Sequence, residues 1–516
     1  LDLIGLPGVP FGARRAAVVA APGRHGLFGN GVQGAPCLRA PAGRAALRCG
    51  AALFVAYPQR DHMTDQPAQT RAQGKLLRVL GVTFGVAVTI GATIGGSIFI
   101  TPAQVAAQLP HPYLYMGVWL AGGLYALLCS VSFAELGTML PRSGGLYVFT
   151  QRALGSYAGF VVGWMDWMQS CGTIGTAALL LGGVVGGLFP AMVARGGQVS
   201  LGVVAGFALL QWAGIRWGSR AQELASLLKV LALVGLGSAA FALGGRLPGA
   251  GSLAGSAPQG LPLLTALVLA LQVVIYVYDG YYGVIYFGEE IRRPERGIPR
   301  SMFGSVFLTI GLYLFINSAY LWVLSLPQMA GEPSVGGAVA RTVFGAGGEA
   351  VIGAMTVVIL LGSVNAYYLS GPRILLAMSR DGLFSRRAVQ VNRRGTPTVT
   401  LFMSMAVSAL FVLSGTFQKA IAVLTFLIVA NYVLTFLAVI VLRRREPGLP
   451  RPYRAWGYPW STGLALASAV AFLAAAVAGD TRNSLYALLA LAASYPAYLL
   501  VRRLGATPPD GRLSPG

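Results

Sequence analysis

Residues 91–99 read Gly91-Ala92-Thr93-Ile94-Gly95-Gly96-Ser97-Ile98-Phe99 and interrupt the first long apolar run of the chain. Each of the three glycines weakens a helix by about 1 kcal/mol relative to alanine. In a bilayer, the backbone N–H and C=O groups freed by such a break must be satisfied by protein, water or ligand. The stretch therefore predicts a broken membrane helix with exposed backbone groups at its centre.

A second interruption, Tyr276-Val277-Tyr278-Asp279-Gly280-Tyr281-Tyr282-Gly283, lies in the sixth apolar run. Runs one and six are corresponding members of two five-helix halves, and paired breaks at such positions indicate an inverted-repeat transporter. A half-helix N-terminus attracts a carboxylate, and free carbonyls attract an ammonium group. A zwitterionic amino acid carries both a carboxylate and an ammonium group, so it can bind at such a pair of breaks. For the first run alone, close packing of small residues is the competing explanation.

The composition requires the bilayer as solvent for much of the chain. Of its 516 residues, 55% are hydrophobic and only 10% are charged, whereas soluble domains carry roughly 25% charged residues. The net charge of +22 does not indicate nucleic acid binding, because the arginines lie in short loops between apolar runs. Basic loops of this kind orient membrane helices and contact anionic lipids.

About twelve apolar runs reach the length of roughly 20 residues that a spanning helix needs. They begin near Val82, Leu114, Tyr157, Val199, Leu224, Leu263, Met302, Ala350, Val399, Ala420, Ser461 and Leu485. Every second connection is rich in arginine, and positive loops stay in the cytoplasm. The sequence predicts an all-α polytopic membrane protein with an even number of spans, both termini cytoplasmic, in a bacterial-type inner membrane.

The two ends of the chain lie outside these runs. Residues 1–75 are predicted to be a disordered or mis-called extension followed by a cytoplasmic N-terminus, with Met63 as the native start, because a polar stretch leads from Met63 into the first run. Residues 76–503 form the predicted transporter domain, and residues 504–516 form a short cytoplasmic tail.

Five stretches of the chain match one family in order. They are Ile94–Phe99 with Pro102, Ala134–Leu136 with Pro141–Tyr147, Tyr278–Tyr282 with Glu289, Glu290 and Pro294–Pro299, Arg373 to Leu383, and Pro450–Tyr453 with Trp456–Pro459. At these residues the sequence resembles the amino acid–polyamine–organocation superfamily of permeases, closest to its L-type amino acid transporter branch. The resemblance runs from about Gly81 to Arg503.

The resemblance implies a LeuT-like fold, in which broken helices 1 and 6 belong to an inverted five-plus-five helix repeat followed by two C-terminal helices. It also implies transport by alternating access. The implied substrate-binding residues are Ile94, Gly95, Gly96, Ser97, Tyr278, Asp279, Gly280 and Tyr281. Backbone of the first four would hold the substrate carboxylate, backbone of Tyr278 to Gly280 its amino group, and Tyr281 would cap the site as an aromatic gate. Ser97 and Asp279 depart from the usual family pattern.

Polar groups within membrane spans are costly and indicate function by default. Lys229 resembles a lysine that occupies the cation position of sodium-coupled relatives, where it replaces sodium or carries a proton; the alternative is a lysine that extends to the interface. Asp166 could partner Lys229, line the pathway or make a polar helix contact. Asn365 is either a wall residue of the pathway or part of an interhelical hydrogen bond.

The predicted function is secondary active transport of amino acids, preferably neutral or small ones, by proton-coupled symport or exchange. A cationic amino acid or polyamine antiporter is the alternative, with an integral membrane enzyme or a channel as rivals of other classes. No catalytic residue, cofactor or metal site is predicted, because the sequence has no metal-ligand cluster, nucleotide loop or nucleophile pair. Protons and anionic lipids are the expected partners of a monomer or homodimer.

Overall fold

A computed structural model of the chain describes residues 75–245, 260–414, 417–479 and 481–505. Contacts divide the chain into the units Leu1–Thr64 and Asp65–Gly516, and every described residue belongs to the second unit. The predictions about Met63, the N-terminal extension and most of the C-terminal tail lie outside the described residues.

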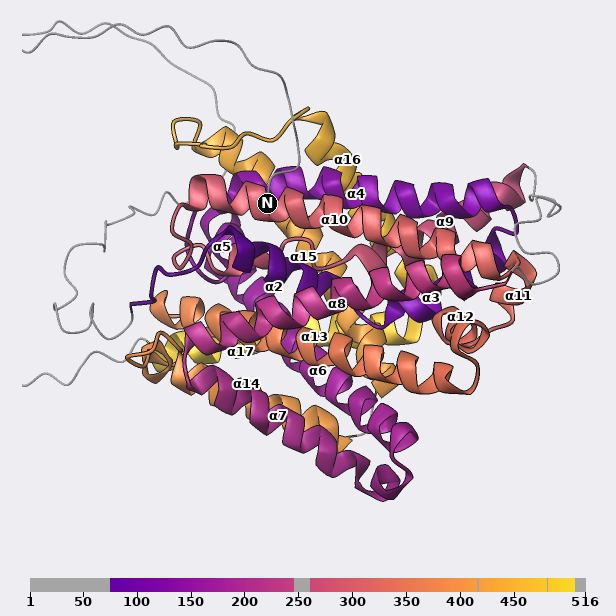
Figure 1. Cartoon of the computed structure of the whole chain (residues 1–516). Coiled ribbons are helices and arrows are strands. Elements are labelled where there is room, and N and C mark those ends of the chain that lie inside the picture. Colours follow the sequence, from indigo (N-terminus) through magenta and orange to yellow (C-terminus); the bar gives the residue numbers. More distant parts are fainter. Residues whose placement is uncertain (1–74, 246–259, 415–416, 480, 506–516) are drawn as a thin grey trace, which may run out of the picture. The chain divides into compact units, whose positions relative to one another are not determined.

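The described chain is a bundle of helices (Figure 1). The long helices are α2 (Val82–Thr93), α3 (Ser97–Gln108), α4 (Pro112–Met139), α6 (Ser156–Leu188), α7 (Gly196–Trp212), α8 (Ile215–Leu243), α9 (Leu261–Tyr278), α10 (Pro294–Val323), α13 (Gly348–Arg380), α14 (Thr398–Ser414), α15 (Phe417–Arg445), α16 (Trp460–Gly479) and α17 (Thr481–Gly505). Shorter elements are α5 (Leu146–Leu154), η1 (Pro190–Arg195), η2 (Gly283–Tyr286), α11 (Leu326–Ala330), α12 (Val335–Phe344), η3 (Gly345–Gly347) and η4 (Arg386–Val389). The prediction of an all-α protein is confirmed.

Six helical segments are long and apolar enough to cross a membrane by themselves. They are Pro112–Met139, Ser156–Leu188, Pro190–Trp212, Ile215–Leu243, Pro294–Val323 and Val335–Arg380. The pair α2 and α3 passes the same test as one span bent by 51°, and α9, α14 and α16 contribute shorter apolar helices. The chain is therefore a polytopic membrane protein, as its composition predicts.

Two helices begin earlier than the apolar pattern predicts. The expected starts near Leu224 and Met302 become Ile215 for α8 and Pro294 for α10. Both helices open with basic, polar turns that a hydropathy window excludes, and proline at the first position of α10 is well placed to begin a helix. The boundaries differ because these helices extend beyond the apolar part of their sequence.

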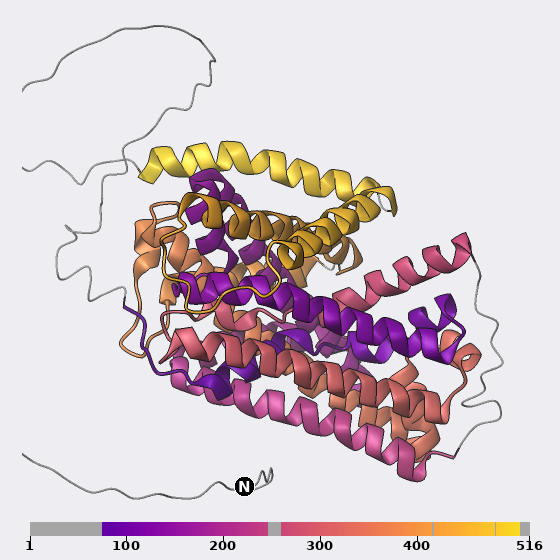
Figure 2. The same ribbon diagram turned by 90° about the horizontal axis from the view of Figure 1, so that it is seen from above.

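The two interrupted helices lie in the interior of the bundle. Helix α2 packs against α8, α10 and α13, and α3 packs against α9. The segment from Asp279 to Tyr282 separates α9 from the short helix η2. Both breaks predicted from the glycines are therefore present. Helices α16 and α17 pack against α15, and Figure 2 shows α17 along one edge of the bundle.

Candidate functional site

The break between α2 and α3 exposes backbone donors. Ile94 leaves the helical conformation, with φ −80° and ψ 99°, while its N–H still donates to Ile90 O at 2.8 Å. The N–H groups of Gly95, Gly96 and Ser97 have no recorded acceptor in the described part of the chain. These donors lie at the N-terminus of α3, where the helix dipole favours negative charge. The arrangement can bind a carboxylate.

The second break meets the first through backbone contact. Gly280 has φ +99°, a conformation that side chains disfavour. A Cβ placed on it would lie 2.8 Å from the carbonyl carbon of Ala92 and 2.9 Å from the nitrogen of Thr93. Only glycine therefore allows the two broken helices to approach this closely.

The backbone after α9 offers acceptors. Asp279 N–H donates to Tyr276 O at 3.2 Å, and Gly283 N–H donates to Gly280 O at 3.0 Å. The carbonyls of Tyr278 and Asp279, between these two bonds, accept no recorded hydrogen bond from the described residues. Carbonyl oxygens are ligands for an ammonium group or another cation. The two breaks thus place free donors and free acceptors on neighbouring segments.

Tyr313 on α10 ties the two breaks together. Its hydroxyl lies 3.3 Å from Thr93 O at the end of α2 and 3.2 Å from Val277 O near the end of α9. One buried hydroxyl thus contacts the last turn of each broken helix. The sequence analysis missed Tyr313, because a single tyrosine inside a long apolar run carries no motif.

Lys229 on α8 is fully buried beside the first break. Its Nζ donates to Gly91 O at 2.9 Å, to Ile94 O at 2.8 Å and to Ser363 Oγ at 3.0 Å. The ammonium group therefore caps the C-terminal end of α2, where the helix dipole is negative. The lysine does not extend to the interface, so that alternative is wrong.

Asp166 on α6 lies near the second break without touching Lys229. Both of its carboxylate oxygens lie 2.9 Å from the hydroxyl of Tyr286, which is the donor. The carboxylate lines a small cavity with Gly280, Gln169 and Ser370. Of the three roles open from the sequence, ion pairing with Lys229 is wrong, since the structure pairs Asp166 with a tyrosine.

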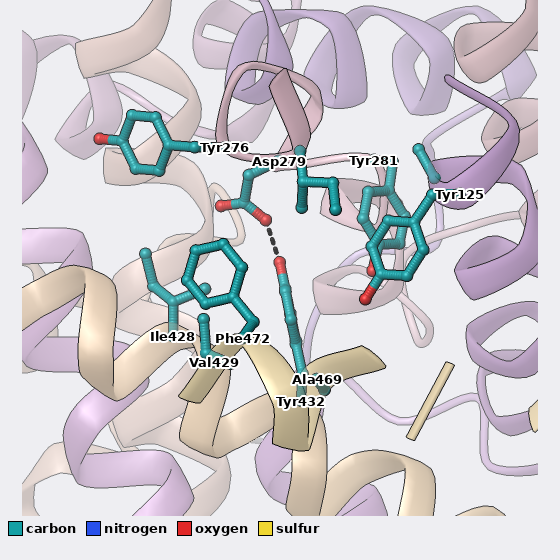
Figure 3. A pocket seen from close by; sticks show the side chains of 11 residues that line it. Tyr125, Tyr276, Asp279, Tyr281, Ile428, Val429, Tyr432, Ala469 and Phe472 are labelled. Carbon is teal, nitrogen blue, oxygen red and sulfur yellow. Dashed lines mark hydrogen bonds between the residues drawn. The ribbon is translucent and has the colours of Figure 1, made fainter. Parts of the chain in front are cut away.

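The side chain of Asp279 lies in a pocket that has no residue of α2 in its lining. Its carboxylate accepts a hydrogen bond from the Tyr432 hydroxyl on α15 and lines a pocket whose wall includes Tyr276 and Phe472 (Figure 3). The backbone of Asp279 therefore belongs to the break, while its side chain belongs to a separate, aromatic pocket. Tyr432 was not predicted, because it lies far along the chain from the second break.

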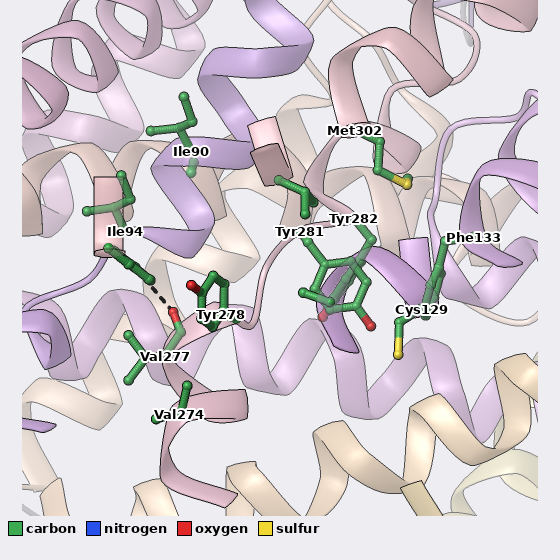
Figure 4. Packing of buried hydrophobic residues seen from close by; sticks show 14 of the residues in the cluster. Ile90, Ile94, Cys129, Phe133, Val274, Val277, Tyr278, Tyr281, Tyr282 and Met302 are labelled. Atoms are coloured by element: carbon green, nitrogen blue, oxygen red, sulfur yellow. Dashed lines mark hydrogen bonds between the residues drawn. The ribbon is translucent and has the colours of Figure 1, made fainter. Parts of the chain in front are cut away.

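Tyr281, the expected aromatic gate, is buried among other rings. It lies edge-on to Phe133 and Tyr282, within the cluster that Figure 4 shows. Its hydroxyl has no hydrogen-bond partner among the residues that the structure describes. Tyr281 lines both the pocket of Asp279 and a smaller cavity with Thr93 and Tyr278. Its position between these two spaces fits a gate.

Asn365 on α13 sits within an interhelical polar network. Its side chain accepts from Gln211 at 2.6 Å and donates to Gln222 Oε1 at 2.9 Å and to Gly218 O at 3.1 Å. These partners lie on α7 and α8. The interhelical hydrogen bond considered from the sequence is therefore present, and Gln222, whose amide donates to Ala87 O at 3.4 Å, links Asn365 to α2.

Ion pairs join the segments at one end of the bundle. Glu290 pairs with Arg373 in full burial, Glu289 pairs with Arg380 at 2.8 Å, and Asp381 pairs with Arg142 at 2.9 Å. We call these six residues the ion-pair layer.

Glu135, a second fully buried acid, pairs with Arg443 at the end of α15 and with Arg451 after it. Glu290 instead pairs with an arginine inside α13, because the loop after η2 turns back into the bundle and brings Glu290 against that helix.

A family model described as amino acid permease matches residues 80–495. The chain is 27% identical to the serine/threonine exchanger SteT of Bacillus subtilis over 429 residues, which cover 82% of this chain and 96% of that protein. It is 27% identical to the mouse Asc-type amino acid transporter 1, covering 73% of each chain. It is 26% identical to the rat large neutral amino acids transporter small subunit 2, covering 77% and 76% respectively. Because the family model covers most of the chain, the broken helices and their free backbone groups belong to a member of the amino acid permease family.

Proposed function

We propose that this protein is a secondary active transporter that moves amino acids across the membrane by alternating access. The substrate lies between the two helix breaks. Its α-carboxylate binds the N–H groups of Gly95, Gly96 and Ser97, and its α-ammonium group binds the carbonyls of Tyr278 and Asp279. One observation carries the proposal: the segment with the free donors and the segment with the free acceptors are neighbours, because Gly280 lies against the backbone of Ala92.

The architecture that fits this function is an inverted five-plus-five repeat. The first half comprises the α2–α3 pair, α4, α6, α7 and α8. The second comprises the α9–η2 pair, α10, α13, α14 and α15, and α16 and α17 follow. In this assignment the chain crosses the bilayer twelve times with both termini cytoplasmic, and the membrane is of the bacterial inner type.

Lys229 takes the place of a coupling cation. Its ammonium group holds the carbonyls of Gly91 and Ile94 at the first break, which is where an unwound helix offers cation ligands. A fixed positive charge at that point makes sodium binding unnecessary. The proposal therefore includes proton-coupled symport or exchange of one amino acid for another.

The ion-pair layer closes the cytoplasmic side of the site. It links the loop after α4 and the loop after η2 to the end of α13. Backbone bonds from Leu80 N–H to Glu290 O at 2.9 Å and from Arg292 N–H to Leu80 O at 3.0 Å add the start of the first span. Alternating access requires these bonds to open when substrate is released inward.

The relatives support amino acids as the substrate. Their names describe serine/threonine exchange, Asc-type amino acid transport and large neutral amino acid transport. The α-amino and α-carboxylate groups are common to all of these, and the two breaks bind only those groups. The choice between neutral, cationic and polyamine substrates depends on the protein residues that surround the side chain of the substrate.

The test is Gly95→Leu. A Cβ at Gly95 would meet only Ser97 Oγ, at 3.7 Å, so the protein can accommodate a side chain there. The leucine would occupy the space of the substrate carboxylate and is expected to abolish binding and uptake of labelled amino acids. Gly235→Leu is the matched control, because Gly235 on α8 also has open space around it. Normal affinity in Gly95→Leu would move the site elsewhere.

The rival classes make different predictions in the same preparation. A channel gives flux that does not saturate and is not stimulated by substrate on the far side. An integral membrane enzyme converts its substrate, so the recovered label would be chemically changed. A carrier alone gives saturable uptake that accelerates when the vesicles contain an unlabelled substrate.

A further inference from the structure

A pocket beside the second break contains a carboxylate that lacks a counter-ion. Asp279 lines it together with residues of α4, α9, α15 and α16 (Figure 3). The hydroxyl of Tyr432 donates to the carboxylate. The ion pairs recorded across the described ranges involve no contact between Asp279 and an arginine or lysine. The negative charge is therefore held by neutral donors alone, the hydroxyl of Tyr432 and the backbone N–H of Gly280.

Such a carboxylate has capacity for a positively charged donor. An ionised carboxylate has about four lone-pair sites, and the hydroxyl and the N–H satisfy two of them. Charges removed from water are normally paired or fully hydrogen-bonded, because an unpaired charge in a region of low dielectric constant is strongly unfavourable. Glu135 and Glu290 each have an arginine partner, whereas Asp166 and Asp279 are each held by a tyrosine hydroxyl.

The rest of the pocket wall suits a cation. Aromatic rings from four helices and from the segment after α9 surround it: Tyr125, Tyr276, Tyr281, Tyr432 and Phe472. The faces of aromatic rings attract cations, and cages of such rings bind ammonium groups. Tyr281 is only 4% exposed, and its hydroxyl has no partner in the described chain. That hydroxyl supplies a second polar atom at the pocket, on the side opposite Tyr276 (Figure 3).

The pocket adjoins the proposed amino acid site. Asp279 contributes its free carbonyl to the break and its carboxylate to the pocket. Tyr281 lines both the pocket and the cavity that contains Thr93 and Tyr278. Tyr281 is a shared wall of the two spaces, so a movement of its ring would let the side chain of a substrate bound at the break reach the carboxylate.

We propose that this pocket binds the positively charged end of a substrate side chain, so that the protein selects cationic amino acids. The inference rests on the proposed amino acid site at the two breaks and adds the substrate class. This substrate class differs from the neutral or small amino acids preferred from the sequence, a preference that did not rest on any structural feature. The ammonium group would receive the carboxylate of Asp279 as its counter-ion and the rings of Tyr276 and Tyr432 as its walls.

The test compares L-lysine with L-norleucine, which has the same carbon chain without the terminal ammonium group. Each competes with labelled substrate for uptake by the full-length protein in proteoliposomes. We expect lysine to compete at least tenfold better than norleucine. In Asp279→Asn we expect lysine affinity to fall by about 30-fold or more, as for loss of a buried charge partner, while norleucine affinity is unchanged. Glu332→Gln, which removes an acid from an exposed ion pair, should keep the wild-type ratio.

Three results would overturn the proposal. The first is equal or better competition by norleucine in the wild-type protein. The second is an equal loss of both competitors in Asp279→Asn. The third is loss of the pH dependence of uptake in that variant with the lysine preference intact, which would identify a proton site.

Two further measurements distinguish misfolding of the variant, failure of the pocket proposal and failure of the transport proposal. If Asp279→Asn does not fold, Tyr276→Leu is the second variant, and an unchanged lysine preference in it would contradict an aromatic cage. Absence of binding by lysine, norleucine and the remaining amino acids would contradict the proposed transport function itself, and with it this inference. Binding of neutral amino acids alone would leave transport intact and reject only the cationic pocket.

Discussion

Gly280 is the residue on which the meeting of the two breaks depends. Its φ of +99° and its contact with the backbone of Ala92 leave no room for a side chain. Gly280→Ala should cost about 1–2 kcal/mol for the left-handed conformation and about 1–3 kcal/mol for the steric clash. We expect a lower thermal midpoint in detergent and little or no uptake. Gly311→Ala is the control, because a Cβ there meets nothing within 4 Å.

Lys229 holds the first break in the structure, and we propose that it also couples transport to protons or to exchange. Lys229→Ala removes the donors to Gly91 O, Ile94 O and Ser363 Oγ, and each carbonyl left unpaired costs about 1–3 kcal/mol. We expect net uptake, or its dependence on external pH, to be lost in proteoliposomes. Wild-type pH dependence in this variant would remove Lys229 from the coupling mechanism.

At the scale of single residues, the sequence located the backbone of the site better than its side chains. Glycine and serine in an apolar run signal a break because few other residues release helical backbone there, so Gly95, Gly96 and Gly280 could be named. Tyr313 and Tyr432 could not, because a tyrosine in a membrane helix has the same appearance whether it contacts lipid, core or ligand. Their roles depend on which helices become neighbours.

At the scale of helices, the buried pair between Glu290 and α13 holds the loop after η2 in place. Arg373→Ala would leave the carboxylate of Glu290 buried without its partner, which costs roughly 3–5 kcal/mol. The double variant Arg373→Met with Glu290→Gln should recover much of this loss. Thermal unfolding of Arg373→Met, of Glu290→Gln and of the double variant forms the cycle that measures the interaction between the two side chains.

An exposed pair provides the comparison. Arg341 and Glu332 lie 2.9 Å apart with side chains 45% and 31% exposed. Exposed pairs contribute about 0–1 kcal/mol, so Arg341→Ala should hardly change the unfolding midpoint. Equal effects of Arg341→Ala and Arg373→Ala would show that the buried pair has no special part in holding η2 against α13.

The helices were predicted as far as they depend on hydropathy. A run of about 20 apolar residues is an unambiguous signal, so each expected run corresponds to a helix in the described chain. Short helices such as α5 and α12 escaped detection, because a window of that length averages over them. The early starts of α8 and α10 escaped for the same reason, since their first turns are polar.

At the scale of the whole molecule, we propose that the ion-pair layer closes the site on the side assigned to the cytoplasm. Glu289→Gln removes the partner of Arg380 and should favour the inward-open state. A cysteine introduced at Ser370, which lines the cavity of Asp166, would report that opening. In a background without native cysteines, we expect it to react with a maleimide several-fold faster than with Glu289 intact.

The control for this experiment is Glu332→Gln, which removes an acid from an ion pair outside the layer. It should leave the reaction rate of the cysteine at position 370 unchanged. An unchanged rate in Glu289→Gln as well would mean that the layer stabilises the fold without controlling access to the site.

The arrangement of the molecule was predicted only through family resemblance. Alternating basic loops predict the orientation of a helix, but they do not show that α2 lies against α8, α10 and α13. Packing between distant segments depends on side-chain shape, which a hydropathy pattern does not contain. The pairing of broken runs one and six was the single sequence feature that connected distant parts of the site.

The central claim is that the two breaks form the binding site of an amino acid carrier. The most direct measurement is uptake of labelled amino acids into proteoliposomes loaded with unlabelled amino acids, with and without an inward proton gradient. We predict saturable uptake that is stimulated by at least one internal amino acid or by the gradient, and that is absent in Gly95→Leu. No flux across the panel from a folded, monodisperse preparation, or full activity in Gly95→Leu, would contradict the account.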